Sequence, residues 1–289
     1  MTITEQHLNL ISLNVRGLRN KEKRDAIFRW CNYQKVDILL LQETYWTDNI
    51  LKIIKNEWIG HCYFCNGTNH SSGVAILISK TFSLPITVTN VFYDCDGRAV
   101  MINVIVNHCK LCIVNIYAPT ERKNREQFFK KIADWIQEKR HLQYDLIIGG
   151  DFNSVLCTQK DVKGNKNNYY KTPIRLKFLV KQFDLCDKRK YNPEKRQFTW
   201  RNLLLNVASR LDYWLIHNHL KSKVIIVDIR PAIRCDHNAI SIKLKLGDTQ
   251  KGPGYWKLNN KVLNDYYYKR QIKNIVGNIE KENVNFGDK

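Results

Sequence analysis

Hydrophobic and polar positions along the chain follow two patterns, one typical of strands and one typical of helices. Short runs rich in Leu, Ile and Val predict strands over residues 8–14, 37–42, 58–65, 73–79, 86–93, 99–107, 111–117, 145–150, 198–200, 209–217, 223–229 and 239–246. Amphipathic stretches predict helices over residues 20–34, 123–140 and 172–183, the last with Thr172 and Pro173 at its N-terminus. Some predicted strands follow one another directly and others are separated by helices. This order predicts a mixed α/β domain of stacked sheets with helices outside.

A change in composition near residue 247 predicts the end of this domain. Residues 247–254, GDTQKGPG, are polar and contain Gly-Pro-Gly, so we interpret them as a linker. Residues 255–289 are polar and rich in Tyr, and we expect them to be mainly helical, either packed on the domain or forming a disordered end. The predicted organisation is one domain over residues 1–246, a linker over 247–254 and a C-terminal connector over 255–289.

The chain is strongly basic. It has 289 residues, with 47 Lys and Arg against 27 Asp and Glu, which gives a formal net charge of +20 at pH 7. A positive field of this size favours polyanionic partners, nucleic acid before an anionic membrane. The 44% hydrophobic content is normal for a globular chain and excludes a disordered one.

Neither membrane insertion nor secretion fits the sequence. The longest apolar runs, over residues 37–42 and 223–228, are strand-sized, whereas a membrane span needs about 20 apolar residues. The N-terminus has no basic region followed by an apolar core, so we expect no signal peptide. Nine Cys, an odd number, then indicate free thiols in a reducing compartment.

Polar residues stand at or near the ends of several predicted strands. A single acid in such a place is usually a solvated turn residue. Several together predict a site, because rigid strands hold side chains around one mouth. These residues are Asn14, Glu43, Asp151, Asn153, Asp212, Asp236 and His237.

The residue types suit metal-assisted hydrolysis of a phosphodiester. Mg²⁺ prefers carboxylate, amide and water ligands, which Glu43 and Asn14 supply. A carboxylate must orient or deprotonate the attacking water, and Asp151 beside Asn153 supplies it.

Charge that develops on the phosphate oxygens needs hydrogen-bond donors or cations. His237, Asn153 and Tyr117 can provide them. A pair between Asp212 and His237 would fix the imidazole tautomer and favour its charged form.

Seven short motifs in order resemble the endonuclease/exonuclease/phosphatase superfamily, which includes DNases and apurinic-site endonucleases. The motifs span about residues 8–245 and are LNVRG with Asn14, LLLQE with Glu43, NIYAP with Tyr117, GGDFN with Asp151 and Asn153, FTW at 198–200, RLDY with Asp212, and Asp236-His237. A closer resemblance, to the endonuclease domains of LINE-type, non-LTR retrotransposons, rests on residues 66–77, on DGR at 96–98 and on GYWKLN at 254–259.

This resemblance implies a fold and a role for each motif residue. The fold is a DNase-like, four-layer α/β/β/α sandwich, with two packed mixed sheets flanked by helices. The implied roles are metal binding by Glu43 with Asn14 and nearby Asp236, water activation by Asp151, phosphate contact by Asn153 and His237, orientation of His237 by Asp212, stabilisation of the phosphate or leaving oxygen by Tyr117, and support by Thr199, Trp200 and Cys235.

The resemblance also implies an activity and partners. We expect Mg²⁺-dependent nicking of one strand of double-stranded DNA, with Mn²⁺ able to substitute, leaving a 3′-hydroxyl that primes reverse transcription. A reverse transcriptase would follow the connector in the full polyprotein. We expect synthesis in the cytoplasm, action in the nucleus, and a monomeric isolated domain.

Two positions depart from the superfamily pattern. Cys235, a weaker hydrogen-bond donor, stands where many members carry Ser before the Asp-His pair. Arg16 stands where repair-type relatives carry an acid, which puts a second metal site in doubt.

Basic clusters over residues 122–125, 160–171 and 188–201 predict contacts with the DNA backbone. Residues 201–209 could form a hairpin that reaches into a groove, although the Leu-rich triplet 203–205 could equally be a buried turn. The candidate DNA-contacting residues are Arg122, Arg125, Lys188, Arg189, Arg196, Arg201 and Asn202.

We expect no zinc site. The pattern over residues 61–70 imitates part of a zinc knuckle, but Ala75 stands where a further Cys is needed. Cys109 and Cys112 lie in one predicted strand, where residues three apart face opposite sides.

Three other functions remain open at this point. An apurinic-site repair endonuclease shares the chemistry, and a phosphatase of the same superfamily would act on a smaller phosphate. A catalytically dead domain that only binds nucleic acid would need no metal carboxylate beside an Asp-His pair, which argues against it.

Overall fold

The computed structural model describes residues 3–67, 72–80, 85–94, 96–140, 143–164, 172–187, 198–202, 204, 206–232, 234–250, 266 and 268–274. The chain divides into a large unit, residues 5–248, and a second unit made of residues 1–4 and 249–289. In the second unit, Tyr266 and residues 268–274 are helical. Residues 251–254 of the predicted linker lie outside the described residues.

Within the described residues, two six-stranded sheets form the large unit. The first has the order β14 (Val224–Arg230), β15 (Ala239–Gln250), β1 (Ile3–Asn14), β2 (Ile38–Gln42), β4 (Val74–Ser79) and β3 (Gly60–Cys65). The second has the order β10 (Leu185–Asp187), β13 (Asp212–His217), β8 (Asp145–Asp151), β7 (Cys109–Tyr117), β6 (Ala99–Val106) and β5 (Ile86–Tyr93). A small third sheet joins β11 (Trp200–Asn202), β12 (Val207–Ser209) and β9 (Val162–Lys163).

Each large sheet contains one parallel pair of strands joined through a helix. β1 and β2 are parallel and α1 (Lys21–Tyr33) connects them, while β7 and β8 are parallel and α3 (Arg122–Lys139) connects them. The Asn20 side chain accepts a hydrogen bond from the Lys23 N–H and so caps α1. In each β-α-β unit the two parallel strands end at the same edge of their sheet, so the carboxyl ends of β1 and β2 lie together, as do those of β7 and β8.

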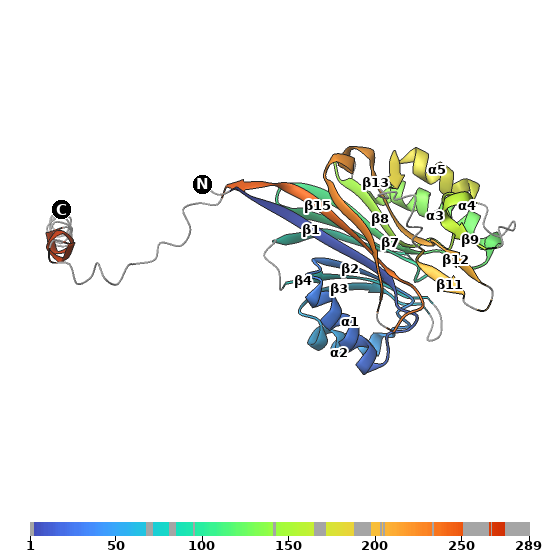
Figure 1. Ribbon diagram of the computed structural model, residues 1–289, viewed down its shortest axis with the longest axis horizontal. Coiled ribbons are helices and arrows are strands. Elements are labelled where there is room, and N and C mark those ends of the chain that lie inside the picture. Colours follow the sequence, from blue (N-terminus) through green and yellow to red (C-terminus); the bar gives the residue numbers. More distant parts are fainter. Residues whose placement is uncertain are drawn as a thin grey trace. The chain divides into compact units, whose positions relative to one another are not determined.

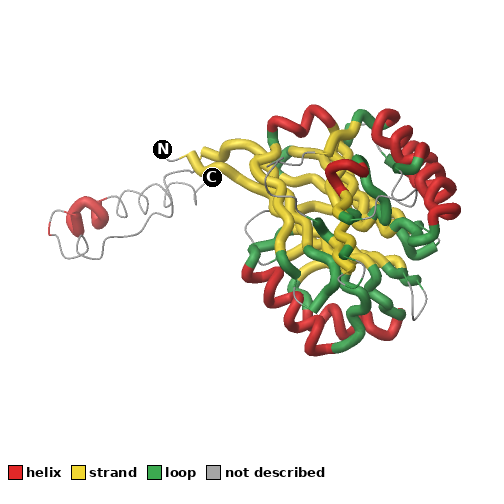
Figure 2. The backbone as a smooth tube through the Cα atoms, turned by 45° about the vertical axis from the view of Figure 1, so that its right-hand side comes forward, coloured by secondary structure: helices red, strands yellow, loops and turns green. Residues whose placement is uncertain are grey.

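The helices cover the outer faces of the sheets. In Figure 1, α1 and α2 (Leu51–Glu57) lie against β1, β2 and β4, whereas α3 and α5 (Ile174–Gln182) lie against β7, β8 and β13. In Figure 2 the strands of the large unit form its centre and helices flank them on both sides. The predicted four-layer α/β/β/α sandwich is therefore confirmed, and a third apolar cluster fills the space between the sheets.

The inner face of the sandwich changes from apolar to polar along each central strand. Successive side chains of a strand point to opposite faces, so every second residue faces the other sheet. These inner rows read Leu8-Leu10-Ser12-Asn14 on β1, Ile38-Leu40-Gln42 on β2, Leu111-Ile113-Asn115-Tyr117 on β7 and Ile147-Gly149-Asp151 on β8. The polar residues are therefore gathered at one edge of the sandwich.

The structure corrects several predicted element boundaries. The strand predicted over 209–217 is interrupted at Arg210 and Leu211, and the strand predicted to end at residue 246 continues to Gln250. The helix predicted from Thr172 begins at Ile174 after Pro173 in the N-cap position. Several short elements were not predicted, namely η1 (Asp48–Ile50), α2, α4 (Thr158–Asp161), β9, β10 and η3 (Asn218–Ser222).

Candidate active site

The polar edge is built by the ends of five central strands. Asn14 ends β1, Glu43 directly follows β2, and Tyr117 and Asp151 end β7 and β8. Asp212 opens β13, which runs antiparallel to β8, and it lies opposite Asp151 in the register. Residues that are up to about 200 positions apart in the sequence therefore meet at one edge, as the strand-end pattern predicted.

Asn14 connects the two halves of the site. Its Nδ2 donates to Glu43 Oε1 at 2.9 Å and to Asp151 Oδ2 at 3.0 Å. Its Oδ1 accepts from the backbone N–H of Arg16 at 3.0 Å, which fixes the orientation of the amide. One buried amide thus holds a carboxylate from the first sheet next to a carboxylate from the second.

Asp151 is buried and is held from two directions. Its Oδ1 accepts from the backbone N–H of Asn153 at 2.8 Å, and the Asn153 side chain donates to the Ala118 carbonyl at 2.8 Å. Burial raises the pKa of Asp151, and the neighbouring Asp212 carboxylate raises it further, although His237 lowers it. A carboxyl group with a raised pKa is suited to accept a proton near neutral pH.

His237 and Asp212 form a buried pair. His237 Nδ1 lies 2.8 Å from Asp212 Oδ2, and the two side chains are 8% and 1% exposed. Burial lowers the pKa of His237, but the Asp212, Asp151 and Asp236 carboxylates together outweigh that effect and raise it. The pair leaves Nε2 as the ring nitrogen for other contacts.

Thr199 and Trp200 hold this pair in place. Thr199 Oγ1 accepts from the backbone N–H groups of Leu211 at 2.9 Å and Asp212 at 3.1 Å. The Thr199 carbonyl accepts from the Asn238 N–H at 2.7 Å, and Trp200 forms a β-bridge with His237. The FTW motif therefore connects the start of β13 to the loop that carries His237.

Two tyrosines lie beside Glu43. Tyr45 donates its hydroxyl to Glu43 Oε2 at 2.6 Å. Burial and the nearby Glu43 and Asp151 carboxylates raise the pKa of Tyr117, so its hydroxyl keeps its proton. The Arg98 guanidinium lies 5.0 Å from the centre of the Tyr117 ring. The sequence pointed to Tyr117 but gave no signal for Tyr45, which lies outside the strand rows.

Several residues around this edge have left-handed backbone conformations. The φ angles are 43° at Arg16, 53° at Glu43, 53° at Tyr45, 45° at Asn153 and 58° at Arg234. Such conformations cost about 1–3 kcal/mol each in non-glycine residues and occur preferentially at functional sites. Glu43 and Asn153, which contact the central residues of the site, are among them.

The family follows from comparison with known proteins. Residues 11–248 match the Endonuclease/Exonuclease/phosphatase family. The chain belongs to this family. The predicted assignment as a phosphodiester hydrolase is thereby supported, and members of this family depend on a divalent metal.

Two known proteins are similar to this chain, one in sequence and one in three-dimensional structure. The chain is 28% identical over 270 residues to a Xenopus laevis protein described as the transposon TX1 uncharacterized 149 kDa protein, covering 92% of this chain and 20% of that protein. The chain thus spans about a fifth of the relative's length. The crystal structure of the AP endonuclease LMAP from Leishmania major is similar with a TM-score of 0.65 and 17% identity, over 83% of this chain and 88% of that one.

The site of this family member fits a divalent cation with oxygen ligands. Glu43, Asp151 and Asp212 place three carboxylates near one another, and Asp212 Oδ1 is buried without a hydrogen-bond partner among the described residues. Ligand atoms of Asp151, Asp212 and His237 all lie within 4.8 Å of one another. Buried carboxylates repel each other, so a cation would offset this cost.

Asp236 and Cys235 lie at the margin of the site. Asp236 Oδ2 accepts from Arg16 Nη1 at 3.0 Å, and both side chains are partly exposed. Arg16 therefore pairs with one of the predicted metal-proximal carboxylates. Cys235 Sγ lies 4.0 Å from the Val15 carbonyl, and burial raises the pKa of this thiol to about 11.

The predicted DNA-contacting residues divide into three groups. Arg122 and Arg201 are exposed, and Asn202 is half-buried. Arg125 is only 2% exposed and donates to the Asn153 carbonyl, so burial contradicts the predicted DNA contact and makes Arg125 a support for the Asn153 loop. The remaining three, Lys188, Arg189 and Arg196, lie outside the described residues.

The predicted hairpin is confirmed in the part of the chain that the structure describes. β11 and β12 pair antiparallel, and Leu204 between them is 98% exposed, so the alternative of a buried turn is wrong for this residue. Residues 203 and 205 lie outside the described residues.

The cysteines behave as the strand pattern predicted. Cys109 packs toward the core between the sheets and Cys112 packs toward the helices, so the two face opposite sides of β7. Eight described cysteines are free. Among the described residues, no helix has the length and apolar character needed to cross a membrane.

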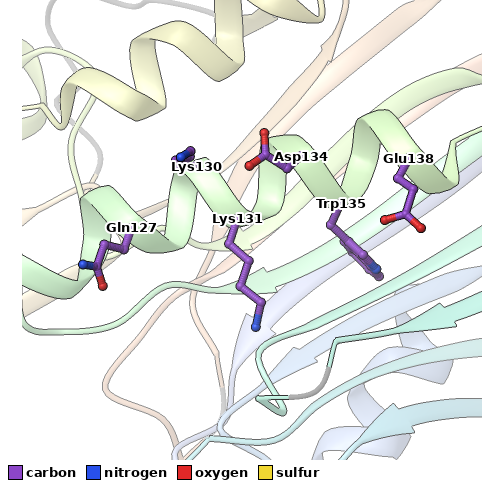
Figure 3. A pocket seen from close by; sticks show the side chains of 6 residues that line it. All are labelled: Gln127, Lys130, Lys131, Asp134, Trp135 and Glu138. Atoms are coloured by element: carbon purple, nitrogen blue, oxygen red, sulfur yellow. The ribbon is translucent and has the colours of Figure 1, made fainter.

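A surface hollow lies away from this edge. It opens on α3, and Figure 3 shows the six side chains that line it along this single helix. These residues are Gln127, Lys130, Lys131, Asp134, Trp135 and Glu138. None of them belongs to the strand ends that build the site.

Proposed function

We propose that this protein is a Mg²⁺-dependent endonuclease that nicks one strand of double-stranded DNA and leaves a 3′-hydroxyl, which primes reverse transcription of a non-LTR retrotransposon. The observation that carries the proposal is the arrangement of Glu43 and Asp151 on one shared amide, next to the buried His237–Asp212 pair. The net charge of +20 supports a polyanionic substrate, and the transposon-encoded relative supports the biological context.

Glu43, with Asn14 beside it, would hold the cation. Mg²⁺ fits the oxygen-rich ligand set and Mn²⁺ can replace it, and when bound the ion supplies Lewis-acid stabilisation of charge on the phosphate. Asp151 faces the same space and would orient the attacking water, accepting its proton on a carboxylate oxygen. Burial and Asp212 raise the pKa of Asp151, which makes it a stronger base than an ordinary aspartate.

His237 and Tyr117 would act on the phosphate. His237 Nε2 would donate to a non-bridging oxygen, while Asp212 balances the positive charge of the imidazole. Tyr117 keeps its proton and would donate it as a hydrogen bond to a phosphate oxygen or to the leaving oxygen. The water oxygen would bond to phosphorus while Asp151 takes its proton, and the bond from phosphorus to the 3′-oxygen would break. The 3′-oxygen would take a proton from solvent, and Asp151 would return its proton to solvent.

The proposed role in transposition sets partners and a place of action. A reverse transcriptase in the same polyprotein would use the 3′-hydroxyl at the nick, because a polymerase extends only from such an end. Chromosomal DNA as substrate would place this step in the nucleus. We also propose that the isolated domain acts as a monomer.

Relaxation of a supercoiled plasmid tests the proposal. We expect conversion to the nicked circle with Mg²⁺ or Mn²⁺ and none with chelator, and a DNA polymerase should extend the nick directly. Glu43→Gln should abolish nicking without unfolding the protein. A protein that binds DNA but never nicks it would contradict the proposal and support a binding module.

Two further substrates separate the alternative enzymes. An oligonucleotide duplex with one abasic position, compared with the intact duplex, should be cut at a similar rate. A large preference for the abasic duplex would support a repair endonuclease instead. Turnover of small phosphomonoesters without DNA nicking would support a phosphatase.

A further inference from the structure

The candidate site is divided between the two large sheets. Asn14 and Glu43 come from β1 and the end of β2 in the first sheet, whereas Tyr117, Asp151 and Asp212 come from β7, β8 and β13 in the second. Apolar packing between two sheets is non-directional and does not by itself fix one sheet against the other. A reaction that needs groups from both sheets therefore requires a directional connection between them.

A buried amide directly below the site makes such a connection. Asn115 on β7 donates from Nδ2 to the carbonyl of Leu41 at 2.8 Å and to the carbonyl of Ala75 at 2.8 Å. Its Oδ1 accepts from Gln42 Nε2 at 2.6 Å. One side chain of the second sheet is thus bonded to two neighbouring strands, β2 and β4, of the first.

Gln42 extends this connection to a third strand. Its Nε2 also donates to Ser12 Oγ on β1 at 3.0 Å. Ser12, Gln42 and Asn115 are all 0% exposed, so their hydrogen bonds do not compete with water. Each lies one or two residues before a site residue of its own strand: Ser12 before Asn14, Gln42 before Glu43, and Asn115 before Tyr117.

The network is not what stability alone would favour. The neighbouring inner positions, Leu40 and Ile113, are apolar and buried. Gln42 Oε1 is buried without a hydrogen-bond partner among the described residues, and a buried unpaired polar atom lowers stability because its lost hydration is not replaced. An apolar layer would avoid this cost, but it would not fix the two sheets directionally.

We propose that Gln42 and Asn115 are positioning residues that set Glu43 and Asn14 against Asp151 and Tyr117. The inference rests on the proposed function, because it assigns these two residues a role in the same site. Neither residue reaches the reacting atoms. They act through the backbones of β2 and β7, whose last residues carry or adjoin the site side chains.

The chain offers a matched control for Asn115. Asn103 is a second fully buried asparagine of the same sheet, on β6, next to β7. Its neighbours Met101 and Ile105 pack toward the helix layer, so it faces away from the first sheet. Among the described residues its side-chain amide has no hydrogen-bond partner. Asn103→Leu is therefore the same substitution in the same sheet without a connection to lose.

The experiment compares Asn115→Leu, Gln42→Met, their double variant and Asn103→Leu with the unchanged protein. For each we would measure kcat and KM for nicking of a defined duplex, the dissociation constant for Mn²⁺ alone by calorimetry, and the free energy of unfolding in urea. Gln42→Met removes the bond to Asn115 Oδ1 but keeps the two bonds that Asn115 Nδ2 donates to the Leu41 and Ala75 carbonyls. This variant therefore remains testable if Asn115→Leu fails to fold.

We expect the positioning variants to lose about 10²-fold in kcat with KM for DNA nearly unchanged, since small misplacements of reacting groups cost about this much. Mn²⁺ binding should weaken about tenfold. The double variant should lose no more than Asn115→Leu alone, because the two residues share one connection. Asn103→Leu should keep both kcat and Mn²⁺ affinity.

Two results would overturn the inference. One is that Asn115→Leu and Gln42→Met lose stability but keep kcat and Mn²⁺ affinity, which would mean that the network has only a structural role. The other is an equal loss in Asn103→Leu. Failure of the proposed function is distinguishable, because the unchanged protein would then not nick DNA at all. Loss of Mn²⁺ affinity in the positioning variants would still support their role in that case.

Discussion

Two clusters of His and Asp lie at opposite ends of the same pair of strands, β8 and β13. At one end, Asp151 and Asp212 meet His237. At the other end, Asp145 opens β8 and His217 ends β13, with His219 in η3 beside them. Both clusters consist of Asp and His side chains with similarly close ligand atoms, yet they differ in burial and in the charges beside each imidazole.

The difference begins with what surrounds each imidazole. His237 faces the Asp212 carboxylate in a buried place. His217 Nε2 lies 2.7 Å from Arg140 Nη1, and its Nδ1 accepts from the Leu146 N–H at 3.2 Å. The Leu146 N–H thus occupies the lone pair of Nδ1, and the Arg140 guanidinium lies beside Nε2, so positive charge and a donor stand where a metal would bind. His219 is 61% exposed and pairs with Asp145 at the surface.

The pKa values of the two imidazoles therefore shift in opposite directions. Burial alone would lower the pKa of His237, but the Asp212, Asp151 and Asp236 carboxylates together raise it. Burial and then the positive charge of Arg140 lower the pKa of His217. A cluster of Asp and His side chains does not make a catalytic site by itself; the charges and burial around it decide.

Removing each imidazole in turn should give the largest contrast. We expect His237→Ala to lower the nicking rate by about 10³-fold, within the range for loss of a positioned proton donor, because no other group can replace Nε2. His217→Ala should change the rate by less than about threefold. The measurement is single-turnover nicking at saturating Mg²⁺. Equal losses in the two variants would remove the distinction between the clusters.

Cation binding should stabilise only one end of the strands. At 100 times its dissociation constant, Mn²⁺ should raise the free energy of unfolding by about 2.7 kcal/mol. Glu43→Gln, which removes the carboxylate proposed to hold the cation, should abolish this increase, whereas Asp145→Asn should keep it. Urea unfolding with and without Mn²⁺ measures both. An increase that disappears with Asp145→Asn would place the ion at the other cluster.

The two histidines should give opposite slopes of stability against pH in chelator. The stability that His237 contributes is complete below its unfolded pKa of about 6.5 and is lost as pH rises through its higher folded value, by at most about 1.4 kcal/mol per pH unit. His237→Gln should remove that fall.

His217 has a lowered folded pKa, so the unfolded chain binds more protons near pH 6. Stability should therefore rise as pH increases through this region, and His217→Gln should remove the rise. Urea unfolding at a series of pH values checks both variants. Slopes of the same sign would contradict the opposite shifts.

Removal of Arg140 should make the charge around His217 more like the charge around His237. We expect this change to have the smallest effect of the four predictions. Arg140→Gln takes away a positive charge beside His217 Nε2, so the pKa of His217 should rise. Stability should fall by about 1 kcal/mol or less, because the guanidinium also lies over the Phe183 ring. Titration by NMR follows the His217 ring, and an unchanged pKa would exclude Arg140 as the cause.

Simple periodicities predicted the stacked sheets with helices outside and the polar residues at strand ends, whereas the four-layer sandwich and the residue roles came from the family resemblance. The apolar strand runs and the polar residues at their ends are visible in the chain, and the strands carry those ends to one edge. The short elements η1, α2 and β10 were missed because they bury too few residues to give a pattern, as with Ile50 and Ile54 around α2.

Contacts between distant segments could not be read from the sequence. Arg125 resembled a DNA-contacting residue because it stands in a basic run, but the helix turns it inward. Arg210 is buried between Asp161 and Asp187, which lie on other elements. Likewise Asn115 stands two residues before Tyr117 as an ordinary strand residue, and its connection to Leu41 and Ala75 depends on how the sheets pack.

The most direct test of the central claim is a comparison of Asp151→Asn with Asp145→Asn in plasmid nicking. The two aspartates stand at the two ends of the same strand, β8. The account predicts that Asp151→Asn, folded and able to bind DNA, leaves the plasmid supercoiled with Mg²⁺, while Asp145→Asn nicks at the rate of the unchanged protein. Nicking at an undiminished rate by Asp151→Asn would contradict it.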